Sequence, residues 1–199
     1  MARLALACLL LALCHNSAEA HGRRLPALNA SGLEIPSSGH GELIALSRHY
    51  GDIIALADRH NTTDPKFRKL SNYARIQRYY CFWGMAPYSA SDEESPFNEC
   101  SHAYLSAAKQ LLLYMRDMPA VAPDANALTS KIDAEMVQEG LAFIGCQYSG
   151  EVFFTSEFLT PHWELLPKHP PSLIAASVPV VLLAGGSLAL RQRKRTRHS

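Results

Sequence analysis

The sequence predicts an all-α protein: a small up-down bundle of about four helices in an ectodomain over residues 41–150, followed by one C-terminal transmembrane helix at 172–190. Two observations predict the bundle: apolar residues recur three and four apart over four stretches, and Pro residues in helix-starting contexts separate these stretches. A third observation predicts the membrane helix, because a long uncharged run lies near the C-terminus.

The uncharged run is Leu173–Leu190, which has 18 residues. A helix rises about 1.5 Å per residue and the hydrocarbon core is about 30 Å thick, so such a run is typical of a membrane span. Residues 191–197 then carry five positive charges, which favours a cytosolic tail over 191–199 and makes anionic lipid a partner of that tail. The alternative is a buried core helix, which seldom ends in five cations.

The N-terminus has the pattern of a signal peptide over residues 1–20: a positive Arg3, the apolar run Leu4–Leu13 and small residues before Ala20. We therefore expect a single-pass type I membrane protein of the secretory pathway, in the endoplasmic reticulum or plasma membrane, with a lumenal or extracellular ectodomain. Two alternatives stay open: an uncleaved signal, which gives a two-span hairpin, and a bacterial periplasmic protein with an inner-membrane anchor.

The first predicted helix covers 41–61, where Leu43, Leu46, Tyr50 and Ile53 form one apolar stripe. The residues before it, 21–40, are rich in Gly, Pro and Ser and lack periodicity, so we expect a flexible lead-in.

The other three helices are bounded by caps and breakers. Asp64-Pro65 begins the second helix and Gly84 ends it; Ser95-Pro96 begins the third, which runs to Met118; Asp124 or Thr129 begins the fourth, which runs to Tyr148 before Ser149-Gly150. Residues 151–171 are less regular and contain Trp163 between prolines. We expect this juxtamembrane segment to pack on the bundle or to lie at the lipid interface.

Three cysteines follow the signal peptide: Cys81, Cys100 and Cys146. The predicted helix ends place all three at the membrane-proximal end of the bundle. The oxidising compartment favours at least one disulfide, and either Cys81–Cys100 or Cys100–Cys146 fits the spacing. Two glycosylation tripeptides begin at Asn29 and Asn61.

Tyr79, Tyr80, Phe82 and Trp83 form the densest aromatic cluster, around Cys81. Five bulky residues in a row cannot all face inward on a helix, so we assign them as candidates for partner binding. The alternative is that they pack under residues 151–171. In the membrane helix, Gly185 and Gly186 are candidates for close helix packing.

Residues 21–171 hold 13 Lys and Arg against 17 Asp and Glu, a net charge of −4, which excludes nucleic acid as a partner. No catalytic, cofactor-binding or metal-binding motif is present, so we predict a non-enzymatic interaction module, an accessory subunit or surface binding protein. Its partner is a membrane protein or a second copy in a homo-oligomer. The alternatives are a membrane-tethered enzyme or redox protein that uses an ectodomain cysteine beside His102, and a self-associating structural protein.

Overall fold

The computed structural model describes residues 32–60, 63–84, 88–144 and 151–178. Four α-helices dominate this part of the chain: α2 (His40–Arg59), α3 (Pro65–Tyr80), α4 (Asn98–Arg116) and α5 (Ala122–Gln138). The prediction of a mostly helical, bundle-like domain is therefore confirmed.

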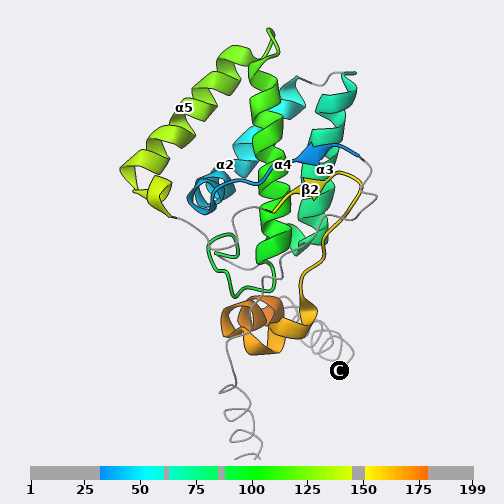
Figure 1. Cartoon of the computed structure of the whole chain (residues 1–199), viewed down its shortest axis with the longest axis vertical. Coiled ribbons are helices and arrows are strands. Elements are labelled where there is room, and N and C mark those ends of the chain that lie inside the picture. Colours follow the sequence, from blue (N-terminus) through cyan, green and yellow to red (C-terminus); the bar gives the residue numbers. More distant parts are fainter. Residues whose placement is uncertain (1–31, 61–62, 85–87, 145–150, 179–199) are drawn as a thin grey trace, which may run out of the picture.

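Helix α4 lies at the centre of the bundle, because it packs against α2, α3 and α5 (Figure 1). Helices α3 and α4 run side by side, whereas α2 lies mainly against α4 and α5. This differs from a regular up-down bundle, in which α2 and α3 would be close neighbours. The small residues Ala103, Ala107 and Ala108 of α4 are fully buried, which lets neighbouring helices approach closely.

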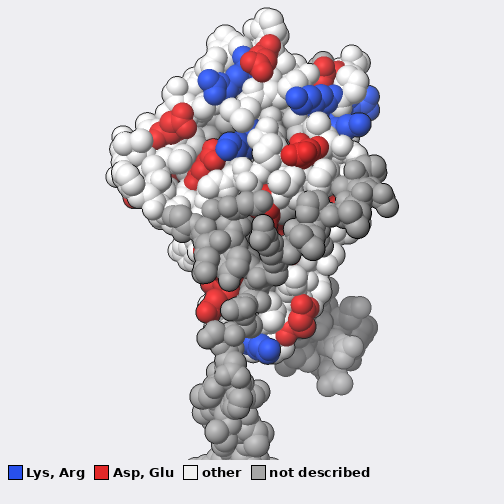
Figure 2. Space-filling model, in the orientation of Figure 1, with Lys and Arg blue, Asp and Glu red and all other residues white. Residues whose placement is uncertain are grey.

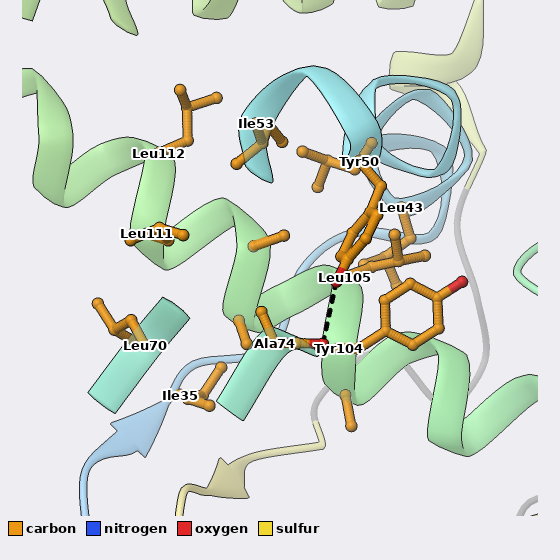
Figure 3. Close-up of a cluster of buried hydrophobic side chains, with 14 of the residues drawn as sticks. Ile35, Leu43, Tyr50, Ile53, Leu70, Ala74, Tyr104, Leu105, Leu111 and Leu112 are labelled. Atoms are coloured by element: carbon orange, nitrogen blue, oxygen red, sulfur yellow. Dashed lines mark hydrogen bonds between the residues drawn. The ribbon is translucent and has the colours of Figure 1, made fainter. Parts of the chain in front are cut away.

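Two tyrosines join the helices inside the core (Figure 3). The rings of Tyr50 and Tyr104 meet edge to face with centroids 5.2 Å apart. The Tyr50 hydroxyl donates a hydrogen bond to the carbonyl of Ala74 at 3.2 Å, which links α2 to α3. Around them, Ile53 and Leu105 are fully buried, and burying such a side chain stabilises by about 1.5–3 kcal/mol.

Local signals placed most helix boundaries within a few residues. Asp64 caps α3, since its carboxylate accepts from the Phe67 N–H at 2.7 Å. The end of the fourth helix was predicted wrongly. Helix α5 ends at Gln138, because Gly140 adopts a left-handed conformation with φ of 68°, and the short helix η2 (Leu141–Phe143) follows.

The residues just before α2 are ordered, unlike the flexible lead-in that we expected over 21–40. Strand β1 (Glu34–Ile35) pairs antiparallel with β2 (Phe153–Phe154), and Ile35 is fully buried. The pair joins segments that lie more than a hundred residues apart, so helical periodicity could not reveal it.

The C-terminal segment, residues 151–178, returns along the bundle as β2, the short helix η3 (Trp163–Lys168) and a helix described over 170–178. The buried side chain of Gln77 on α3 holds this segment. Its amide N–H donates to the Leu159 carbonyl and its amide oxygen accepts from the Leu159 N–H, both at 2.9 Å. One side chain thus pairs with the backbone as a neighbouring strand would.

Among the described residues, no helix is both long enough and apolar enough to cross a membrane. Only residues 172–178 of the expected span, 172–190, fall in the described part, and there they are helical.

Replacing Gln77 tests how much this pairing stabilises the fold. Gln77→Met keeps the volume but leaves the buried N–H and C=O of Leu159 without partners, so we expect a loss of about 2–4 kcal/mol in the free energy of unfolding. Urea unfolding of the purified full-length chain in detergent measures it. Gln138→Met, at an exposed position on α5, is the matched control, and equal stabilities of the two variants would contradict the role of Gln77.

The core also makes a prediction for alkaline pH. Burial raises the pKa of Tyr50 from 10.0 to about 12, and the positive charge of Arg78 beside the ring opposes this only in part. A group whose folded pKa is raised stabilises fully below its unfolded pKa and loses that contribution as pH rises through the folded pKa. The free energy of unfolding should therefore fall between pH 10 and 12.

Unfolding curves at several alkaline pH values test this expectation. Tyr50→Phe should flatten the decline, whereas Tyr79→Phe, at an exposed position, should leave it unchanged. The same slope in all three proteins would exclude Tyr50 as its source.

Candidate functional site

The structure selects one of the two candidate disulfides. Cys81, at the end of α3, is bonded to Cys100 in the first turn of α4, and both are buried. Neither sulfur is therefore a free thiol next to His102, so the redox alternative depends on Cys146, which lies outside the described residues. The bond joins the end of α3 to the start of α4, the two most closely packed helices.

The aromatic cluster around Cys81 divides into two parts. The first lies on the outer side of α3, where Ile76, Tyr79 and Tyr80 have the spacing of one helix face and are 40%, 59% and 46% exposed. Phe158 of the C-terminal segment stacks on Tyr80 with centroids 5.0 Å apart. We call these four residues the α3 apolar face.

The second part points away from this face because the backbone turns after Cys81. Phe82 has a positive φ of 52°, which is rare for a bulky side chain, and begins the short helix η1 (Phe82–Gly84). Its ring meets Trp163 edge to face at 4.9 Å, and Trp163 also meets Phe97 at 5.7 Å. We call these three residues the Trp163 cluster; the side chain of Trp83 is outside the described part.

The contacts of the C-terminal segment account for part of this aromatic cluster. Residues 151–171 do pack against Tyr80 and Phe82, as the alternative reading expected. They cover the two residues only in part, since Tyr80 and Phe82 remain 46% and 42% exposed, and partner binding by these residues stays a prediction.

The segment before α4, residues 88–97, receives the end of the C-terminal segment. His169 Nε2 lies 2.8 Å from the Asp92 carboxylate, and the Ser172 hydroxyl lies 3.5 Å from that of Ser95. The His162 N–H donates to the Pro96 carbonyl at 2.9 Å. We call residues 88–97 the α4 entry segment. The C-terminal segment binds to it through the side chains of His169 and Ser172 and through the backbone of His162.

Two further histidines support the α4 entry segment from the other side. His40 and His102 are buried, and their rings meet edge to face at 5.5 Å. Each Nε2 lies 3.2 Å from a backbone carbonyl, that of Ser91 or Ala90. This arrangement could not be predicted from local patterns, because His40 and His102 lie 62 residues apart in the chain.

Ser172, His169 and Asp92 have the order of groups found in the catalytic triad of serine hydrolases. The Ser172 hydroxyl lies 2.7 Å from His169 Nδ1, and Nε2 of the same ring contacts Asp92. However, Ser172 is fully buried, and its backbone N–H also approaches Nδ1, at 3.3 Å. His169 therefore caps the helix over 170–178, and the hydroxyl has no access to a substrate.

Charged groups of both signs are mixed on the face shown in Figure 2, without a broad basic patch. Some of them form ion pairs between elements, such as Arg48 of α2 with Glu135 of α5 and with Glu139, the residue just after α5. Hydrogen bonds from His49 and Arg48 lower the pKa of Glu135. Within the described ranges, no group of three or more His, Cys, Asp or Glu side chains is arranged to hold a metal ion.

The described surface has small hollows of about 320–370 Å³. One of about 320 Å³ lies between β1 and the helices α3 and α4, lined by residues that include Leu33, Lys66 and Tyr114. Tyr114 donates to Asp64 at 3.0 Å, so its hydroxyl serves the cap of α3. This hollow brings together no set of groups with an evident chemistry.

Several predicted features lie outside the described residues, and the structure does not describe them. These are the signal peptide (1–20), the glycosylation candidates Asn29 and Asn61, the third cysteine Cys146, the glycines Gly185 and Gly186, and the basic tail (191–199).

Comparison with known proteins adds no assignment, since the chain matches no protein-family model, curated protein or solved structure.

The disulfide yields a direct test. Peptide mapping under non-reducing conditions should recover Cys81 linked to Cys100. The double variant Cys81→Ser/Cys100→Ser should lower the free energy of unfolding by about 3 kcal/mol, since the bond closes a loop of about 20 residues. Adding a thiol reductant should lower the free energy of unfolding of the wild type but not that of this double variant. A linked peptide containing Cys146 and Cys100 would contradict the Cys81–Cys100 pairing.

Proposed function

We propose that this protein is a single-pass type I membrane protein whose helical ectodomain binds a membrane protein partner, as an accessory subunit or surface binding protein. The anchor is the uncharged run within 172–190, followed by the basic tail. The signal peptide at 1–20 directs the chain into the secretory pathway, where the cysteines become oxidised and Asn29 and Asn61 are acceptors for glycans.

The observation that carries the binding role is the α3 apolar face. Ile76, Tyr79 and Tyr80 are large apolar side chains held on a rigid helix, and their exposure costs free energy unless another surface covers them. Tyrosine is enriched at the centres of protein interfaces because it supplies a large contact area and a polar hydroxyl.

The position of this face favours a partner in the same membrane. It lies on the last turns of α3, next to the disulfide that closes the membrane-proximal end of the bundle. A membrane protein held beside this chain meets that end of the domain first. The span supports the same choice, because Gly185 and Gly186 allow close approach of a second helix.

A homo-oligomer is the second candidate, because Cys146 is left over from the described disulfide. It predicts a covalent dimer on non-reducing gels that Cys146→Ser abolishes.

Mild-detergent affinity purification of the full-length chain from its native cell tests the first candidate. We expect one larger membrane protein at near one-to-one stoichiometry. Tyr79→Ser should weaken its retention about thirtyfold, since truncating a central interface aromatic costs about 2 kcal/mol. The matched control is Phe143→Ser, which alters an aromatic residue that is 92% exposed on η2. Equal retention by both variants, or the absence of any partner, would contradict the proposal.

A further inference from the structure

We propose that the Trp163 cluster lies in the headgroup layer of the bilayer that anchors this chain, so that the bundle rests directly on a zwitterionic lipid surface. The inference rests on the proposed membrane anchor and deepens it. Three observations support it. The uncharged run is only just long enough to cross the bilayer, the bundle follows it directly without a linker, and Trp163 packs on the same α4 entry segment as Ser172.

The uncharged run is no longer than the hydrocarbon core is thick. Its 18 residues, Leu173–Leu190, extend about 27 Å as a helix, against a hydrocarbon core about 30 Å thick. The run therefore cannot slide outward and still cross the core. Leu173 must lie close to the boundary between hydrocarbon and headgroups.

No linker separates this boundary from the bundle. Ser172, next to Leu173, is fully buried against the α4 entry segment, and His169 is 9% exposed and pairs with Asp92. From Leu173 on, apolar side chains of the same helix turn outward, since Ile174 and Val178 are 65% and 49% exposed. The helix over 170–178 thus leaves the bundle where the membrane must begin (Figure 1).

The Trp163 cluster lies within reach of the same boundary. Ser172 contacts Ser95, while Trp163 packs on Phe97, two residues further along. Trp163 and Ser172 therefore contact the same short α4 entry segment, and the headgroup layer is about 5–7 Å thick on each side of the core. Trp163 and Phe82 remain 43% and 42% exposed, and Trp is the residue most typical of this layer.

The charges around the cluster decide which lipid surface fits. The α4 entry segment carries Asp92, Glu93 and Glu94, and Glu164 follows Trp163, whereas Lys168 is the cation of η3. This acidic surrounding disfavours anionic headgroups. The occupant that we assign is therefore a zwitterionic leaflet, such as phosphatidylcholine.

Quenching of tryptophan emission by lipid tests the inference. The full-length Trp83→Phe variant keeps Trp163 as its single tryptophan and is placed in phosphatidylcholine nanodiscs, with a fraction of the lipid brominated near the headgroup end of the acyl chain. We expect loss of most of its emission. The matched control, Trp83→Phe/Trp163→Phe/Ala120→Trp, carries the reporter on the α4–α5 turn at the opposite end of the bundle and should stay bright (Figure 1).

The outcomes separate this inference from the proposed function. An embedded chain whose Trp163 emission is unaffected by brominated lipid would overturn the lipid contact and leave the anchor intact. Equal quenching of Trp163 and of the Ala120→Trp reporter would show that the loss of emission does not depend on position in the bundle, and would also overturn the lipid contact. A chain that is not incorporated into nanodiscs would overturn both. If Trp83→Phe unfolds the protein, the difference between wild type and Trp163→Phe gives the same readout.

Discussion

The hydrogen-bonded pairing between Gln77 and Leu159 is the constraint that positions the C-terminal segment on the end of the bundle where α3 ends and α4 begins. A buried amide that lost either partner would cost about 1–3 kcal/mol for each unsatisfied group. Because both of its groups are matched to the backbone of one residue, it fixes the C-terminal segment in position and in direction. Phe158 and Trp163 can reach the aromatic residues at the end of α3 only when that segment is held there.

The α4 entry segment is the second centre of organisation. Histidines from both ends of the chain meet it: His40 and His102 through backbone carbonyls, and His169 through Asp92. The disulfide between Cys81 and Cys100 adds a covalent link one turn into α4. The exposed aromatic residues thus sit on a rigid base, which suits a binding surface because little conformational entropy is lost on contact.

The sequence predictions succeeded where a structural feature depends on residues close together in the chain, and failed where it depends on residues far apart. The start of α3 was predictable, since the Asp64 cap and Pro65 act within one helical turn. The end of α5 was not, because Gly140 and Gly150 are equally good stops by sequence and the apolar period continues past the first of them. The partner of Gln77 lies 82 residues away, and the strand that pairs with β1 lies further still, so neither could be found by local patterns. The aromatic cluster was found from composition, but its division at Phe82 depends on one backbone angle.

The strand pair between β1 and β2 has a consequence for biogenesis. A chain made from its N-terminus exposes Ile35 and the inner side of α3 long before Phe153 and Leu159 are synthesised. The α3–α4 hairpin can form early, because its contacts are local. The C-terminal segment, residues 151–178, can pack only after nearly the whole domain has been synthesised. During that interval the nascent domain presents an unpaired strand edge and an unsatisfied amide. A chaperone that recognises extended apolar chain can bind during that interval, which ends when Phe153 and Leu159 take their places on the bundle.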